Sequence, residues 1–364
     1  MRILIYTKKI TPRIKYIFKH ILNQRLGLKI DFTSDVKLFK KYDSFKISYD
    51  QVQFQSEFNV NPSEILFSSK IEDLDIDVVN WDGLPIFFQN DNKDSFKFDV
   101  FGASFYLMSR YEEYLLHLKD DFGRFDPSSS LAHKNRFLNK PIIDFWIQRL
   151  ESYLKKIYPE IKFKKNHFKF ETRLEVPCLY EYKGKGVVRT IFGVLRDVLN
   201  FDLYRLYFRF MVLIKIKKDP LDNYESWINI NNKAGVKTAL FFLISDFSRY
   251  DRNLSFYSKS FVEKVKDVSD FCEVSLLSSY LSSENKLLLS EEKNRLNSVV
   301  NKPVLNVRQH LLKLNFPNTY RNFIKLGFES DYSLQYYDLP GFRASTSNPF
   351  FFYDLENEVE TKLI

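Results

Sequence analysis

The second half of the sequence alternates apolar, strand-like segments with helical ones, and this alternation restricts the fold more than any other feature. Five segments are predicted as strands: Phe168–Val176, Lys237–Ser245, Phe271–Leu277, Pro303–Arg308 and Glu329–Leu334. Helical patterns lie between them, at Val187–Asn200, Ser258–Val268, Ser290–Val299 and Thr319–Leu326. Repeated β–α units predict a parallel sheet or barrel. In such folds the chemistry lies at the carboxyl ends of the strands.

The first half has a mixed strand and helix pattern. Residues 3–6 predict a first strand, and Thr11 followed by Pro12 is a typical helix start. Further helices are predicted over 101–118 and 141–157, and the basic segment 162–167 separates the halves. We therefore predict an α/β chain with an N-terminal αβ domain over residues 1–162 and a (β/α) barrel over residues 163–364.

Composition excludes several classes of protein. The chain has 45% hydrophobic residues, which predicts a globular fold, and two Cys, which cannot build a disulfide scaffold or a Cys-rich zinc module. Its five His are scattered, so no local His-pair metal motif exists. The apolar run at 208–216 is interrupted by Arg209 and Lys215. We therefore expect no membrane span and a cytoplasmic protein.

Basic residues exceed acidic ones, 55 to 46, a net charge of +9. The densest basic runs are Lys162–Lys165 and Lys215–Lys218. Each is either a solvated surface or a contact with an anionic membrane or an anionic glycan. Nucleic acid is not an expected partner, because no helix-turn-helix, zinc-finger or RNP signature accompanies the charge.

Polar and aromatic side chains follow the predicted strands of the second half. The candidates for a site are Glu175, Tyr180, Asp246, Tyr280, Arg308, His310, Asp331 and Arg343. Ordinary structural roles are the alternative for each: Asp246 after Ser245 is typical of a cap, and a Tyr often simply packs. In the first half, Arg110 and Glu113 predict an ion-pair network at an interface between the two domains.

Several short motifs together resemble one family. In the first half they are residues 99–114, 122–125 and 139–141; in the second half they are residues 219–220, 241–243, 308–310, 316–317 and 340–343. On these motifs the chain resembles the polysaccharide deacetylase-like proteins of Bacteroidetes, in which an N-terminal domain of unknown function precedes a NodB-type deacetylase barrel. The resemblance implies metal-assisted amide hydrolysis of N-acetyl sugars, with a divalent metal such as zinc, an Asp base and a His acid.

The metal motifs of that family are altered in this chain. Relatives typically end the first barrel strand with Asp-Ile-Asp, where this chain has Glu175-Val176-Pro177. They end the third with Gly-Leu-His-Pro-Ser-Tyr, where this chain has residues 275–280, so that Leu277 replaces the metal His and Pro177 the second Asp. A hydrolytic site needs about three protein ligands. We therefore predict no bound metal or other cofactor, and a catalytically inactive protein of surface-glycan metabolism.

Site roles follow from the resemblance. Glu175, His310 and Asp331 are the vestigial catalytic candidates. The candidates for binding a polysaccharide or amino-sugar ligand are Tyr180, Asp246, Tyr280, Arg308 and Arg343. The first alternative is an active N-deacetylase with a rearranged site around Glu175, Asp246, His310 and Asp331. The resemblance also implies an incomplete NodB-like barrel that lacks its last strand or strands, because five strands are predicted here against about seven in the family. The second alternative is therefore a structural or assembly subunit, with an open edge for a protein partner.

Overall fold

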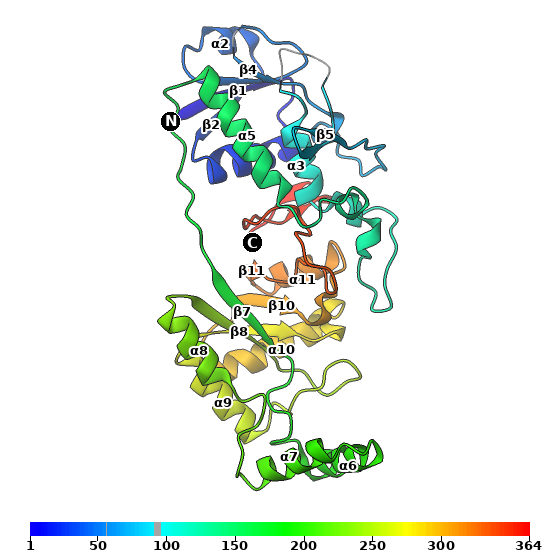
Figure 1. Cartoon of the computed structure of the whole chain (residues 1–364). Coiled ribbons are helices and arrows are strands. Elements are labelled where there is room, and N and C mark those ends of the chain that lie inside the picture. Colours follow the sequence, from blue (N-terminus) through cyan, green and yellow to red (C-terminus); the bar gives the residue numbers. More distant parts are fainter. Residues whose placement is uncertain (56, 91–95) are drawn as a thin grey trace. The chain divides into compact units, whose positions relative to one another are not determined.

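The computed structural model describes residues 1–55, 57–90 and 96–364 (Figure 1). The chain forms two compact units. Unit 1 comprises residues 1–168 together with 334–364, and unit 2 comprises residues 169–333. None of the helices in these described ranges is long and apolar enough to cross a membrane.

Unit 1 is built on a four-stranded parallel sheet in the order β2-β1-β3-β4. Its strands, including those of two small antiparallel pairs, are β1 (Arg2–Thr7), β2 (Lys29–Thr33), β3 (Lys46–Tyr49), β4 (Phe58–Val60), β5 (Val79–Trp81), β6 (Leu84–Ile86), β12 (Tyr353–Asp354) and β13 (Val359–Glu360). Its α-helices are α1 (Pro12–Phe18), α2 (Val36–Lys41), α3 (Val100–Met108), α4 (Leu131–Lys134) and α5 (Ile142–Ile157). A π-helical segment, η1 (Lys19–Arg25), continues α1, and short 3-10 segments are η2 (Glu64–Leu66), η3 (Tyr111–Glu113) and η4 (Pro127–Ser129).

The predicted start of the first helix is confirmed. The Thr11 hydroxyl accepts a hydrogen bond from the Ile14 amide, and Pro12 takes the first helical position. The helix predicted over 101–118 is shorter, because Arg110 has φ 54°, a left-handed conformation that ends α3 before η3 begins. Phe18 of α1 stacks on Phe101 of α3, with ring centroids 3.7 Å apart, so the two helices share one core.

The C-terminal segment corrects the predicted division of the chain. The sequence pattern predicts residues 334–364 as part of the barrel, yet they belong to unit 1. The reason is apolar burial: Tyr336, Tyr353 and Leu355 lie in the same hydrophobic cluster as Phe18 and Trp146. Burial of large apolar side chains is the dominant favourable contribution to folding, so these contacts fix the segment on unit 1.

The predicted interface network around Arg110 lies inside unit 1. Arg110 Nε donates to Glu113 Oε1 at 2.8 Å, and Arg343 Nη2 donates to Glu113 Oε2 at 2.6 Å. Arg110 also donates to the main-chain carbonyl of Arg343. All three side chains are buried. The network therefore joins the α3–η3 region to the C-terminal segment, and all of its residues belong to unit 1.

Unit 2 contains a five-stranded sheet in the order β11-β10-β9-β8-β7, in which every neighbouring pair is parallel. Its strands are β7 (Glu171–Val176), β8 (Lys237–Leu243), β9 (Glu273–Ser278), β10 (Asn306–Gln309) and β11 (Ser330–Asp331). Its helices are α6 (Gly186–Leu199), α7 (Leu203–Leu213), α8 (Tyr224–Lys233), α9 (Lys259–Ser269), η5 (Leu281–Ser283), α10 (Lys286–Val300), η6 (His310–Leu312) and α11 (Asn318–Lys325). The predicted parallel sheet of β–α units is confirmed.

The sheet of unit 2 curls into a half-barrel. Arg308 of β10 hydrogen-bonds Glu175 of β7, although β8 and β9 lie between these strands in the sheet. Two side chains three strands apart meet only where the sheet is strongly curved, because neighbouring strands are about 4.8 Å apart. Along β8, residues Ala239, Phe241 and Leu243 form an apolar cluster with Leu277 of β9.

Candidate functional site

A cluster of polar groups lies where the parallel strands β8, β9 and β10 end. Asp251 follows β8, Tyr280 follows β9 and His310 follows β10. His310 Nδ1 and Asp251 Oδ1 are 2.9 Å apart, and both residues are buried. The carboxyl ends of parallel strands share one edge of a sheet, which explains how residues almost sixty positions apart come together here.

Asp251 is held in place from several sides. Its Oδ1 accepts a hydrogen bond from the Tyr280 amide at 3.0 Å, and its Oδ2 accepts one from the Ser248 hydroxyl at 2.8 Å. Burial alone would raise the pKa of Asp251, but the bonds from His310, Tyr280 and Ser248 outweigh it and lower the pKa. The carboxylate is therefore kept charged beside the imidazole, an arrangement able to accept or deliver a proton.

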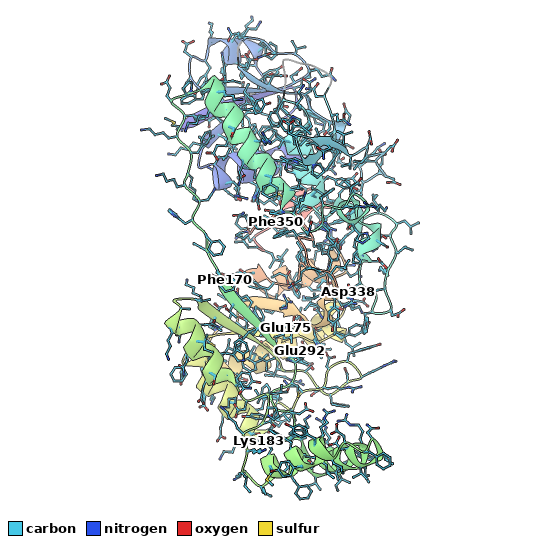
Figure 2. All side chains as sticks on the ribbon, viewed as in Figure 1. Phe170, Glu175, Lys183, Glu292, Asp338 and Phe350 are labelled. Carbon is cyan, nitrogen blue, oxygen red and sulfur yellow. The ribbon has the colours of Figure 1, made fainter. Side chains whose placement is uncertain are left out.

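A second buried carboxyl group lies on α10. Glu292 is fully buried, and its Oε2 accepts a hydrogen bond from the Ser279 amide at 3.0 Å (Glu175 and Glu292 are labelled in Figure 2). Burial raises the pKa of Glu292 to about 7, and the negative charge of Asp251 acts in the same direction. Its protonation state therefore changes near neutral pH.

Glu175 and Arg308 form an ion pair across the half-barrel. Arg308 Nε donates to Glu175 Oε1, and Arg308 Nη1 donates to the Tyr332 carbonyl. Arg173 of β7 adds a guanidinium 4.5 Å from the centre of the Tyr332 ring. The Glu175 carboxylate, which a metal ion would need as a ligand, is therefore already paired with the Arg308 guanidinium.

The remaining catalytic candidates have separate partners. Asp331 Oδ2 accepts a hydrogen bond from the Tyr320 hydroxyl at 2.7 Å, and burial raises the pKa of Asp331. Asp246, 73% exposed at its side chain, pairs with Arg295 at 3.0 Å. The four residues of the rearranged site (Glu175, Asp246, His310 and Asp331) are therefore each bound to a different neighbour.

The residues present do not fit a hydrolytic metal. Leu277 is fully buried in the apolar cluster of β8 and β9, and Pro177 has no ligand atom. Within residues 1–55, 57–90 and 96–364, no group of three or more His, Cys, Asp or Glu side chains is placed to hold a metal ion. A zinc site of the kind that the family resemblance implies needs about three such ligands.

Three of the residues predicted to contact a sugar lie in different surroundings. Tyr280 is half-buried at the edge of the sheet, with the Tyr250 ring 4.3 Å away and the Lys313 ammonium 4.3 Å from its ring centre. Tyr180 is 1% exposed, so protein covers its ring. Arg343 is buried in unit 1 against Glu113. Only Tyr280 of these three lies at the polar cluster.

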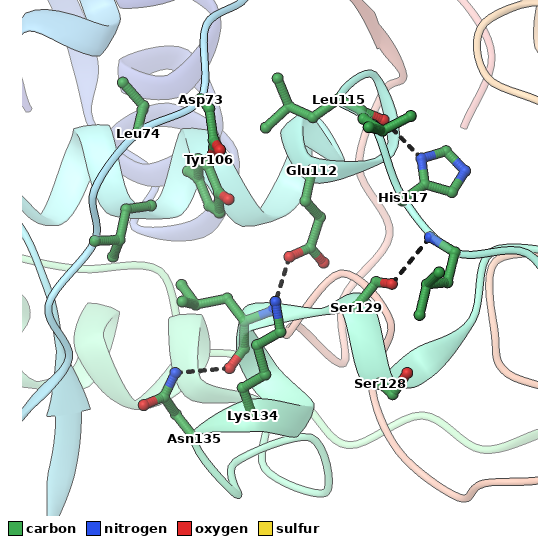
Figure 3. A pocket seen from close by; sticks show the side chains of 14 residues that line it. Asp73, Leu74, Tyr106, Glu112, Leu115, His117, Ser128, Ser129, Lys134 and Asn135 are labelled. Atoms are coloured by element: carbon green, nitrogen blue, oxygen red, sulfur yellow. Dashed lines mark hydrogen bonds between the residues drawn. The ribbon is translucent and has the colours of Figure 1, made fainter.

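Unit 1 contains a pocket of about 840 Å³ (Figure 3). Glu112 lies in its wall, where Oε2 accepts a hydrogen bond from the Leu131 amide at 2.8 Å. His117 Nδ1 contacts the Leu115 carbonyl at 2.8 Å, and the Ser129 hydroxyl accepts from the Leu118 amide. These polar atoms are therefore engaged in hydrogen bonds within the protein. The remaining wall of the pocket is largely apolar.

Comparison with known proteins gives one family match. Residues 3–159 match the model of a family of unknown function, DUF7033. The pocket of unit 1 lies wholly within this DUF7033 region. No curated protein matches the chain.

A solved structure resembles part of the chain distantly. It is a proposed polysaccharide deacetylase from Mycobacterium smegmatis, with 11% identity and a TM-score of 0.29. The alignment covers 46% of this chain and about half (51%) of that one. A likeness at this level supports no conclusion about the function of this chain.

Sequence reasoning missed Asp251 and Glu292. Asp251 lies in the loop after β8, whereas the sequence pattern indicates Asp246 in that loop. Glu292 shares one helix face with Leu289, Leu296 and Val299, all buried. The signal that could have identified Glu292 is an acidic residue on the helix face that is otherwise apolar.

Proposed function

We propose that the protein is a deacetylase-like carbohydrate-binding protein whose half-barrel lacks metal-dependent hydrolysis. The observation that carries the proposal is the state of the former metal positions. Leu277 is packed among apolar side chains, and Glu175 is paired with Arg308. Without three ligands, a cation cannot be held firmly enough to polarise an acetyl carbonyl.

The polar cluster supports binding of a sugar. The paired rings of Tyr250 and Tyr280 offer an aromatic surface, and the buried Asp251–His310 pair lies directly behind the Tyr280 amide. Sugar rings present C–H faces to aromatic side chains, so this pair of half-buried rings suits an amino-sugar unit.

Binding and hydrolysis are tested together on the full chain. Oligomers of N-acetylglucosamine are titrated by saturation-transfer NMR and calorimetry, and acetate release is followed with and without a chelator. We expect binding that Tyr280→Ala weakens and that the matched variant Tyr257→Ala, at a 79% exposed position, leaves unchanged. We expect no chelator-sensitive release of acetate. Such release, or near-stoichiometric zinc in the purified protein, would refute the inactive assignment.

A second candidate function is hydrolysis without a metal. It is favoured by the Asp251–His310 hydrogen bond, because a carboxylate-oriented imidazole is a common acid–base device. In that case, acetate release is insensitive to chelator and is lost in His310→Gln. Tyr257→Ala is again the control.

A further inference from the structure

Helices α6 and α7 form a hairpin whose apolar side chains face solvent. The hairpin lies at the bottom of Figure 1, beyond the sheet of unit 2. Between residues 187 and 216, fifteen large apolar side chains are exposed. Ile191, Phe192, Leu195 and Leu199 repeat along one face of α6, and Phe192 is 68% exposed. Soluble monomers rarely leave an apolar surface of this extent uncovered.

Two charged side chains of the hairpin, Asp197 and Arg209, are buried between its helices, where apolar ones are expected. Arg209 of α7 bonds Asp197 of α6 at 2.7 and 2.9 Å, and both side chains are at most 4% exposed. The helices approach at Gly193, where an added Cβ would lie 2.6 Å from Arg209 Nη1. A helix pair with an ion pair inside and apolar residues outside is inverted relative to a water-soluble pair.

Positive charge surrounds this apolar surface. Residues 183–218 contain nine Lys and Arg and two Asp, a net charge of +7 out of +9 for the whole chain. Of the two acidic side chains, Asp197 is the one paired with Arg209, and Asp202 caps α7 through the Arg205 amide. Lys215, Lys217 and Lys218 follow α7 and are exposed, and Lys183 precedes α6 (Figure 2).

We propose that the α6–α7 hairpin binds the surface of an anionic phospholipid bilayer. Its helices of 14 and 11 residues are about 21 and 16 Å long at 1.5 Å per residue, too short for a hydrocarbon core of about 30 Å. They lie in the interface with their apolar faces inserted, while the lysines contact lipid phosphates. A helix that docks into a protein groove buries one of its faces. Here the exposed apolar residues occupy two helices and the segment after them.

This proposal does not depend on the carbohydrate site, because the hairpin and the polar cluster share no residue. It also gives a role to the basic run at 215–218, which the proposed sugar site does not use.

Vesicle sedimentation of the full chain tests the proposal. Vesicles contain phosphatidylglycerol and phosphatidylcholine in equal amounts, or phosphatidylcholine alone. We expect the chain to prefer the anionic vesicles and to be released by salt. Phe192→Glu should weaken binding at least about tenfold, because insertion of a Phe side chain is lost. The control Phe168→Glu replaces a Phe that is 91% exposed outside the hairpin, and it should bind like the parent chain.

The charge contribution is measured separately. Lys217→Gln with Lys218→Gln should lower affinity for anionic vesicles by about tenfold or more and leave the weak binding to neutral vesicles unchanged. Equal loss in Phe192→Glu and Phe168→Glu, or no sedimentation with either vesicle, overturns the proposal. A hairpin-dependent dimer in analytical ultracentrifugation without vesicle binding also overturns it, and assigns the surface to a second copy of the chain.

Discussion

Glu292 puts a carboxyl group inside the apolar face of α10, and this has a cost that depends on pH. The pKa of about 7 in the folded protein lies above the ordinary value of 4.5, so the folded state favours the protonated form. The unfolded state ionises first as pH rises. The free energy of unfolding should therefore fall between about pH 4.5 and pH 7, by on the order of 3 kcal/mol.

Glu292→Gln removes this titration while keeping an acceptor for the Ser279 amide. We expect the variant to be more stable than the parent chain at pH 8, and the advantage to disappear near pH 4. Glu291→Gln is the matched control, since Glu291 is the exposed neighbour on the same helix. Urea unfolding across this pH range measures the difference. If both variants follow the parent curve, the pKa of Glu292 is not raised.

Leu277→His restores the residue that the family resemblance predicts at this position. The imidazole would enter the apolar cluster formed with Phe241 and Leu243, without a partner. We expect a loss of stability of about 2–4 kcal/mol, because a buried polar group replaces a packed Leu. Zinc should not reverse the loss, since Arg308 holds Glu175 and Pro177 offers no ligand. A rise in melting temperature on adding zinc would show that a metal geometry persists.

At the scale of single residues, the family resemblance predicts that metal positions are altered, but it does not predict the contacts of the residues around them. Leu277 and Pro177 are visible in the sequence because the family motif gives a register for the strand ends. The partner of His310 is not, because Asp251 lies in an irregular loop whose path depends on the Ser248 and Tyr280 contacts.

Helix caps differ in how deeply they are buried, and the difference is testable. Asp99 caps α3 through the amides of Phe101 and Gly102, and it also accepts bonds from the Tyr49 and Ser63 hydroxyls. Asp35 caps α2 at an exposed position. Asp99→Ala should cost about 3–5 kcal/mol, because two buried hydroxyls lose their acceptor, and Asp35→Ala about 1 kcal/mol. Thermal unfolding of the two variants compares them. Equal losses would mean that Asp99 acts only as a cap.

At the scale of elements, period and propensity predicted the five strands of unit 2 and most of its helices. They did not predict α7 or α8. The apolar residues of α7 form a run that charged residues interrupt, and the sequence pattern uses this run only to exclude a membrane span. The left-handed Arg110, which ends α3, also lacks a local signal, since Gly and Asn are the residues typical of that conformation.

At the scale of the whole chain, unit 1 is discontinuous. Its C-terminal part contributes Arg343 to Glu113, Glu358 to Arg13 and Ser347 to Asp144. Arg343 and Arg110 lower the pKa of Glu113, although burial alone would raise it. These contacts join residues separated by more than two hundred positions. A linear pattern carries no information on such pairings, so sequence reasoning assigned the segment to the neighbouring barrel.

Removal of residues 334–364 tests this division. A chain ending at Ser333 leaves Glu113 with one arginine fewer and uncovers the cluster that holds Tyr353 and Leu355. An unbalanced buried charge and an open core are both strongly destabilising, so unit 1 should unfold or become molten. Hydrogen exchange should then rise around Trp146 in α5, while the amides of β8 stay protected, because unit 2 has its own sheet. Slow exchange around Trp146 in the shortened chain would show that the segment is only an attachment.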